Sequence, residues 1–107
     1  MLNQVSKMPM TSVLAGVTTE APTDPNSTSW SIKINKGTAT TGTVTLTAKS
    51  RGATTAETVY DSNGVAIVFN AASSTAQTYY FPNTPVDLVV MTPSTLDGTY
   101  TYALTQW

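Results

Sequence analysis

Apolar and polar side chains alternate at every second position over several stretches of this chain. In residues 28–34, Trp30, Ile32 and Ile34 share one face of an extended segment, and serines and a lysine occupy the other. Residues 43–49 repeat the pattern, with valine, leucine and alanine set against threonines. A period of two is that of a β-strand, so each stretch predicts a strand with one buried face.

Further strands are predicted between turn residues. Residues 57–61 and 65–70 flank Ser62-Asn63-Gly64, whose Asn-Gly pair favours the two positive-φ positions of a type I′ hairpin turn. Residues 65–70 are apolar on both faces, which predicts a central strand. Turn residues separate three more predicted strands, residues 77–81, 86–92 and 99–106.

Strands separated by breaks every 8–12 residues or so predict an all-β fold. We expect an antiparallel β-sandwich or a jelly-roll-like barrel, and no stretch predicts a helix. A chain of 107 residues is suited to one hydrophobic core. The predicted core is formed by Trp30, Ile32, Ile34, Val44, Leu46, Val59, Ile67, Phe69, Phe81, Leu88, Val90, Tyr102 and Leu104.

The first 27 residues differ from the sandwich domain predicted over residues 28–107. They contain Pro9, Pro22 and Pro25, and proline fixes φ and removes a backbone donor. We therefore expect an extended N-terminal arm over residues 1–27, with a short strand at residues 12–18. Such an arm lies either over its own sheet or against a neighbouring subunit.

The arm and the final residue supply the predicted contacts with a partner. A tryptophan at position 107 carries a large apolar surface, and docking into a groove on this domain or on a neighbour would bury it. The predicted partner-binding residues are Leu2, Val5, Met8, Met10, Val13, Leu14 and Trp107.

Composition narrows the range of partners. Charged residues make up 10% of the chain, its net charge is −1, and it has only five bases. Five bases are too few to neutralise a run of phosphates, so we expect no nucleic-acid partner. No stretch approaches the roughly 20 apolar residues that span a bilayer, so we expect no membrane partner either.

The residue types that most often perform chemistry are scarce. The sequence has no histidine and no cysteine, which removes the commonest general base and the thiolate ligands of metals. We therefore expect no enzymatic activity, no catalytic residue and no cofactor. Asp87 and Asp97 with loop carbonyls would suit calcium, but no EF-hand spacing exists, and Asp97 is better explained by a turn at Gly98.

Aromatic side chains support a second hypothesis, that of a sugar-stacking platform. Aromatic faces bind sugars in many modules, but aromatic residues are also enriched in cores and subunit interfaces, which is the more economical interpretation here. The residues concerned are Trp30, Tyr79, Tyr80, Tyr100, Tyr102 and Trp107.

The sequence of residues 42–52, 59–64 and 98–102 resembles that of the small threonine-rich β-sandwich proteins of tailed-bacteriophage virions. Capsid decoration or cement proteins are the nearest type. The resemblance implies a virion structural protein at the capsid surface, commonly a homo-trimer, whose arm and sheet edge clamp the major capsid protein or other virion subunits. A carbohydrate-binding or adhesive module of a tail fibre or cell wall is the alternative.

Overall fold

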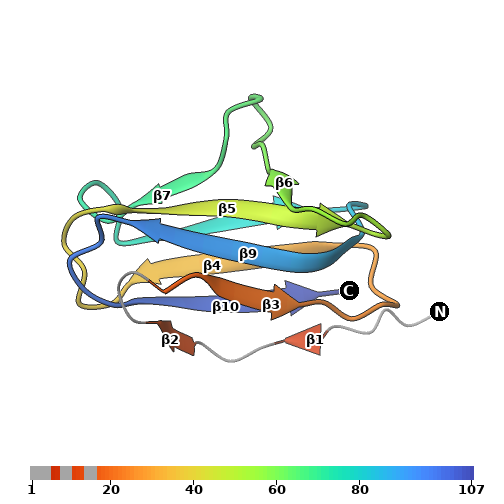
Figure 1. Ribbon diagram of the computed structural model, residues 1–107, viewed down its shortest axis with the longest axis horizontal. Coiled ribbons are helices and arrows are strands. Elements are labelled where there is room, and N and C mark those ends of the chain that lie inside the picture. Colours follow the sequence, from red (N-terminus) through yellow and green to blue (C-terminus); the bar gives the residue numbers. More distant parts are fainter. Residues whose placement is uncertain (1–5, 8–10, 14–16) are drawn as a thin grey trace.

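The computed structural model describes residues 6–7, 11–13 and 17–107, and these residues form two antiparallel β-sheets packed face to face (Figure 1). No helix occurs in these ranges. The predicted all-β sandwich is confirmed. Sheet A contains β1 (Ser6–Lys7), β2 (Thr11–Val13), β4 (Trp30–Lys36), β8 (Ala76–Phe81) and β10 (Tyr100–Gln106), and sheet B contains β3 (Thr19–Pro22), β5 (Thr43–Ser50), β6 (Glu57–Thr58), β7 (Val68–Asn70) and β9 (Val86–Ser94).

The order of strands gives the sandwich two different edges. In sheet A, β1 and β2 both pair with β10, which pairs with β4, which pairs with β8. In sheet B the order is β3, β9, β5, and then β6 and β7 side by side on the far flank of β5. One edge therefore carries β1, β2 and β3, and the opposite edge carries β8, β6 and β7 (Figure 1).

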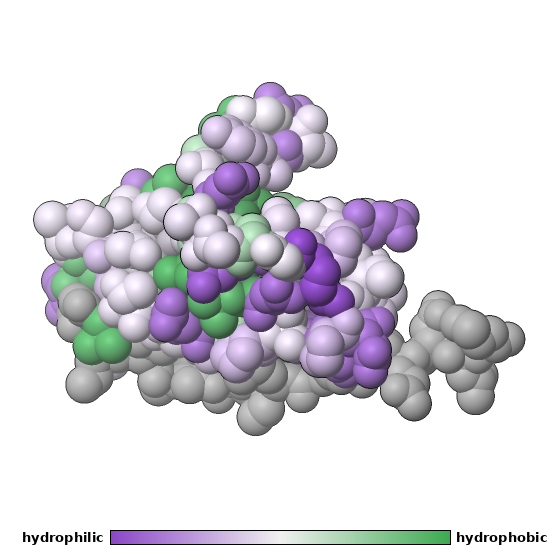
Figure 2. All heavy atoms as spheres, turned by 45° about the vertical axis from the view of Figure 1, so that its right-hand side comes forward, coloured by the Kyte–Doolittle hydropathy of each residue, from purple (hydrophilic) through white to green (hydrophobic). Residues whose placement is uncertain are grey.

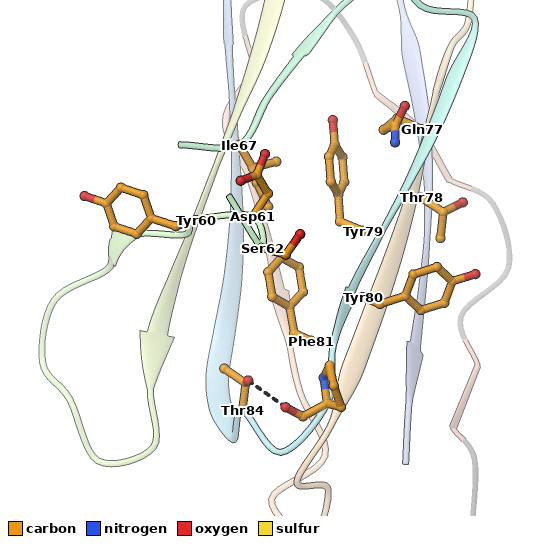
Figure 3. A pocket seen from close by; sticks show the side chains of 11 residues that line it. Tyr60, Asp61, Ser62, Ile67, Gln77, Thr78, Tyr79, Tyr80, Phe81 and Thr84 are labelled. Carbon is orange, nitrogen blue, oxygen red and sulfur yellow. Dashed lines mark hydrogen bonds between the residues drawn. The ribbon is translucent and has the colours of Figure 1, made fainter. Parts of the chain in front are cut away.

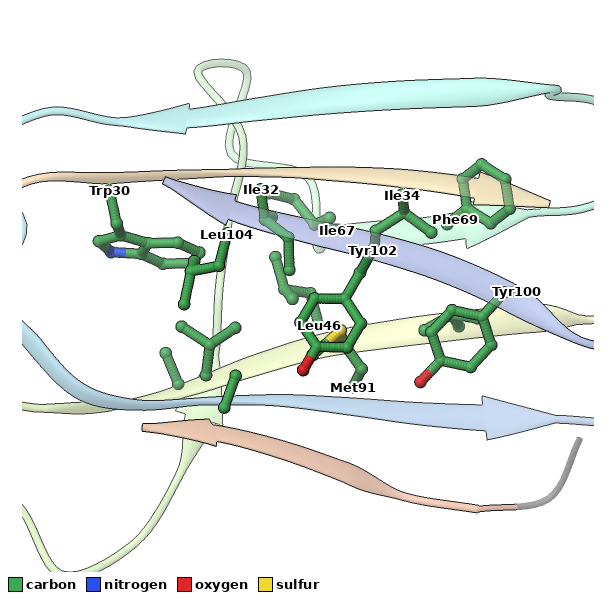
Figure 4. Close-up of a cluster of buried hydrophobic side chains, with 14 of the residues drawn as sticks. Trp30, Ile32, Ile34, Leu46, Ile67, Phe69, Met91, Tyr100, Tyr102 and Leu104 are labelled. Atoms are coloured by element: carbon green, nitrogen blue, oxygen red, sulfur yellow. The ribbon is translucent and has the colours of Figure 1, made fainter. Parts of the chain in front are cut away.

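The core lies between the sheets, where the alternating faces meet (Figure 4). Trp30 stacks on Phe81 with ring centroids 4.2 Å apart and an interplanar angle of 23°. Burying one apolar face of each strand removes large aliphatic and aromatic side chains from water, which drives the sheets together. The prediction is confirmed for Trp30, Ile32, Ile34, Val44, Leu46, Ile67, Phe69, Phe81, Tyr102 and Leu104, while Val59 is only partly buried against this cluster.

The core face of β9 differs from the prediction. Val86, Val89 and Met91 belong to the core cluster, whereas Leu88 is half-buried and Val90 is buried but lies outside the cluster. A register shift near the end of β5 inserts an extra residue into β9, and this bulge moves the inward face. Because β9 is apolar on both faces, alternation alone does not reveal the choice.

The predicted central strand lies instead at an edge. β7 pairs with β5 and with no other described strand. Its outward Val68 remains 44% exposed. Although β7 is apolar on both faces, only one of its faces is therefore covered.

The turn before β7 also differs in type. Gly64 N–H donates to the Asp61 carbonyl at 3.0 Å, and Gly64 has φ +77°, while Asn63 does not have a positive φ. This is the geometry of a type I turn followed by a left-handed glycine rather than of a type I′ turn. The Asp61 carboxylate supports it by accepting bonds from the N–H groups of Asn63 (2.9 Å) and Val65 (3.0 Å).

Within residues 1–27, the described strands pair with the chain's own sheets. β1 and β2 lie along β10, and β3 lies along β9. Of the strand expected at residues 12–18, residues 12 and 13 belong to β2, residues 17 and 18 directly precede β3, and residues 14–16 lie outside the described residues. Arg51 fixes the following loop. Its guanidinium donates to the carbonyl oxygens of Pro25, Ser27 (3.0 Å) and Val86 (3.0 Å) and forms an ion pair with Asp87 at 2.8 Å.

Candidate interaction surface

Residues 59–66 form a hairpin that projects from the edge of sheet B (Figure 1). Besides the turn bond from Gly64 N–H to the Asp61 carbonyl, two backbone bonds join its arms, from Asp61 N–H to the Val65 carbonyl and from Ile67 N–H to the Val59 carbonyl, both 2.9 Å long. Tyr60 and Ala66 form the one bridge between its arms. Figure 2 shows the hairpin standing clear of the body of the molecule. A two-stranded hairpin of this kind is weakly held by its own contacts.

Exposed apolar side chains gather at the same edge. Of five large hydrophobic side chains exposed in the described residues, four belong to the hairpin, β7 or β8. These are Tyr60 (57% exposed), Val65 (59%), Val68 (44%) and Tyr80 (69%). Tyr60 and Tyr80 point to opposite sides of this edge, so the exposed apolar side chains are distributed around it (Figure 3).

A cleft of about 540 Å³ separates the hairpin from β8 (Figure 3). Five consecutive residues, 77–81, line one side, so the cleft follows the length of β8. Figure 3 shows Tyr79 rising between Ile67 and Gln77, with Tyr80 directed to the other side of the strand. We call this space the edge cleft. It is lined by Tyr60, Asp61, Ser62, Ile67, Gln77, Thr78, Tyr79, Tyr80, Phe81, Pro82 and Thr84.

The chemistry of the edge cleft is mixed. Buried parts of Ile67 and Phe81 form apolar surface, and the Asp61 carboxylate, the Ser62 hydroxyl and an amide from β8 add polar groups. Burial raises the pKa of Tyr79, and the negative charge of Asp61 raises it further. Tyr79 therefore stays a neutral hydroxyl at physiological pH, able both to donate and to accept a hydrogen bond.

The open edge of β8 forms the rim of the cleft. Lys36 N–H donates to the Thr75 carbonyl at 3.0 Å, which identifies this opposed pair as a hydrogen-bonded pair of the ladder with β4. Bonded and non-bonded pairs alternate along an antiparallel ladder. The peptide groups of Ala76, Thr78 and Tyr80 consequently point away from β4, toward the open edge.

The six aromatic residues considered for sugar stacking do not form one platform. Trp30, Tyr100 and Tyr102 are buried in the core, at most 4% exposed. Burial of these rings agrees with the core interpretation of the aromatic pattern. Only Tyr79 and Tyr80 of the six line the edge cleft, and they point in different directions.

Most of the predicted partner-binding residues cannot be placed. Leu2, Val5, Met8, Met10 and Leu14 lie outside the described residues, and Val13 is the last residue of β2. Trp107 is half-buried, and its backbone exchanges bonds with Ser29 at 3.0 Å and 3.1 Å. The edge cleft was not predicted, because one wall comes from the hairpin at the edge of sheet B and the other from β8 of sheet A, although all lining residues fall within residues 60–84. The sequence feature that could have indicated the cleft is the pair of adjacent tyrosines in β8.

The two aspartates weighed for calcium do not meet. Asp87 lies at the start of β9, where it pairs with Arg51, and Asp97 lies beyond the other end. Asp97 accepts bonds from the Thr40 hydroxyl (2.5 Å) and from the N–H groups of Thr40 (2.7 Å) and Thr41 (3.0 Å). These bonds hold its pKa well below the usual range, the hydroxyl contributing most. The described ranges contain no group of three metal-ligating side chains.

Comparisons with known proteins place the fold but not a family. No family model matches the chain, and no curated protein matches it significantly. A solved chain from Bacillus endospore appendages, described as a novel family of disulfide-linked pili, has a TM-score of 0.60 and 20% identity over 96% of this chain and 84% of that one. The SPBc2 prophage-derived protein YomS has a TM-score of 0.52 and 12% identity over 99% of this chain and 96% of its own.

At these identities the two likenesses establish a shared fold. Each match extends over nearly the whole of this chain, so the sandwich and its flanking strands are compared together rather than a fragment. Where the chain is described, it has no helix long and apolar enough to cross a membrane. Function has to be argued from the surface itself.

Proposed function

We propose that this protein is a non-catalytic structural subunit of a virion, and specifically a capsid decoration protein. In this role it binds adjacent capsid subunits through its N-terminal arm and its sheet surface, and it stabilises the shell by binding the assembled form. The localisation that follows is the outer surface of the capsid.

The observation that supports this most directly is the apolar edge formed by the hairpin, β7 and β8. Four exposed hydrophobic side chains on one edge would be costly in water for a chain that acts alone. The remaining surface is rich in threonine and poor in charge, with 10% charged residues overall. Short hydroxyl side chains lose little entropy when ordered, so many weak contacts can add up on a repeating lattice.

The structural neighbours are consistent with such a role. One comes from a spore appendage and the other from a prophage, and the first is described as assembling into pili. The disulfide linkage named for those pili is unavailable to a sequence without cysteine. Assembly of this protein is therefore proposed to use non-covalent contacts alone.

Co-sedimentation with capsids of the phage that encodes the chain tests the proposal. The unmodified protein should pellet with capsids and raise their melting temperature. A Tyr60→Ser/Val65→Ser variant should lose about tenfold in affinity, since two exposed apolar anchors are removed. Thr41→Ser is the control, because Thr41 is exposed in the loop between β4 and β5 and lies outside both the arm and this edge. Failure of the unmodified protein to bind capsids would overturn the capsid assignment.

Carbohydrate binding is the second candidate, and the composition of the edge cleft favours it. Tyr79 offers a ring and a hydroxyl, and Asp61 and Gln77 offer hydrogen-bonding groups within one recess. Binding of the unmodified protein to a glycan array, lost in Tyr79→Ala but kept in Thr41→Ser, would establish an adhesive module in place of a decoration protein.

A further inference from the structure

We propose that the edge cleft receives the β1–β2 edge of a second copy of this chain, so that sheet A continues from one copy into the next. This inference rests on the proposed structural role and names a partner within it, the chain itself. Three features support this contact: the unprotected edge of β8, the direction of the strands and the positions of the two edges.

The first argument is that β8 lacks the devices that normally block strand addition. Its sequence, Ala-Gln-Thr-Tyr-Tyr-Phe, contains no charged residue and no proline. In sheet B, β3 carries Glu20 and Pro22 and β6 carries Glu57, and β7, which has neither a charge nor a proline, is only three residues long. Edge strands of monomeric proteins are usually shielded by charges, prolines or bulges. Sheet A thus keeps an edge whose outward peptide groups are free to pair.

The second argument is strand direction. Every neighbouring pair in sheet A is antiparallel: β1 and β2 to β10, β10 to β4, and β4 to β8. Four strand positions across the sheet mean that β1 and β2 run opposite to β8. A second copy in the same orientation therefore presents its β1–β2 edge antiparallel to β8. The extended sheet keeps the alternation that it has within one copy.

The third argument is that donor and acceptor lie on opposite edges. β1 and β2 run along one edge of the sandwich, and β8 with the hairpin forms the other (Figure 1). A contact between two different edges is head-to-tail, and it repeats into a closed ring or an open filament according to the rotation between copies. A trimer is one such ring.

The edge cleft has the form that an incoming strand requires. It runs beside residues 77–81, and six residues of β8 extend over about 20 Å at roughly 3.3 Å per residue. The main chain of the added strand would pair with Ala76, Thr78 and Tyr80. Alternate side chains would enter the recess above Tyr79 and Phe81. Main-chain pairing combined with side chains entering pockets is usual in β-strand addition.

Disulfide trapping tests the contact in the full-length protein. Because the sequence has no cysteine, single substitutions introduce the only thiols. A Ser62→Cys chain mixed with a differently tagged Ser6→Cys chain should form cross-linked heterodimers about tenfold faster than a Ser73→Cys chain with the same partner. In the register of sheet A, Ser6 stands level with Phe81 of the cleft, whereas Ser73 lies beyond the far end of β8, so only the first pair gains effective concentration. Ser62 and Ser73 are both exposed serines in turns, so they have matched reactivity. Equal rates would overturn the proposal.

Amide hydrogen exchange supplies a second readout that needs no substitution. As protein concentration rises, the amides of Ala76, Thr78 and Tyr80 should gain protection while that of Glu57 stays unchanged. A Thr78→Pro variant should lose both this protection and the cross-link. Thr78→Lys should do the same if the proline variant does not fold.

The outcomes separate this inference from the proposed function. Capsid binding without cross-linking or protection would overturn the strand addition alone. Cross-linking without capsid binding would support strand addition and reject the capsid role. Protection of β8 that appears only on adding a glycan would assign the edge cleft to a sugar and overturn the proposal.

Discussion

The body of the sandwich and the projecting hairpin contain similar apolar residues but bury them to different extents. In the body, Trp30 and Leu46 are at most 1% exposed, because a second sheet covers them. In the hairpin, Tyr60 and Val65 are 57% and 59% exposed, because residues 59–66 extend past the cover of sheet A. Apolar side chains stabilise the fold in the first region and are left available for a partner in the second.

The largest test of this contrast compares two aliphatic truncations. Leu46→Ala should lower the free energy of unfolding by about 2–5 kcal/mol, because it leaves a cavity between two sheets. Val68→Ala, on the exposed face of β7, should change it by less than about 0.5 kcal/mol. Urea titrations followed by Trp fluorescence measure both. Equal losses would show that β7 is covered in solution.

Two glycines sharpen the comparison at the level of the backbone. Gly42 has φ +99°, and a Cβ there would lie 2.5 Å from the Leu96 Cα, so Gly42→Ala should cost about 2–4 kcal/mol from strain and overlap. Gly64 has φ +77° but no atom within 4 Å of such a Cβ, so Gly64→Ala should cost about 1–2 kcal/mol from strain alone. Thermal melts of both variants distinguish the two contributions, and a larger loss for Gly64→Ala would contradict this account.

Arg51 offers a test of intermediate size. Arg51→Met removes donors to the carbonyls of Pro25, Ser27 and Val86 and should cost about 1–2 kcal/mol, mostly through those hydrogen bonds, since a partly exposed ion pair contributes little. Asp61→Asn in the hairpin turn is the counterpart in the projecting region, and it should cost less than about 0.5 kcal/mol, because the amide oxygen can still accept the bonds from the N–H groups of Asn63 and Val65. Chemical denaturation measures both. A greater loss for Asp61→Asn than for Arg51→Met would contradict this account.

The smallest effect concerns pH at the end of the body. The pKa of Asp97 is lowered in the folded state, so its contribution to stability is present above the unfolded value of about 3.9 and is lost as pH falls below it. Asp97→Asn should therefore lower the melting temperature at neutral pH, and the difference from the unmodified protein should shrink as the pH is taken from about 4 to about 2. A difference independent of pH would show that the charge of Asp97 is not involved.

Prediction from the sequence succeeded where one face of a strand is apolar and the other is polar. β4, β5 and β10 were placed within two residues of their observed bounds for this reason. It failed for β9, where both faces are apolar and a bulge decides which side turns inward. It also failed for β7, because exposed apolar residues give the same sequence pattern as buried ones.

Local sequence patterns could not predict the edge cleft. Ser62 lies in the turn of the projecting hairpin and Tyr79 in β8 of sheet A, and only the tertiary structure brings them to the same space. The charge-free sequence of β8 could have indicated an edge open to pairing. Recognising β8 as an edge, however, requires knowing that β4 pairs with β10 on its other side.

The position of β10 has a consequence for synthesis. Although it is the last strand along the chain, it lies between β4 and the N-terminal strands, and β1 and β2 pair with no other described strand. A nascent polypeptide that has not yet released Tyr100 to Gln106 from the ribosome leaves β4 open and gives β1 and β2 no ladder to join. Prematurely terminated products would therefore leave β1 and β2 without a partner strand, and under the proposed strand addition they would lack the donor edge.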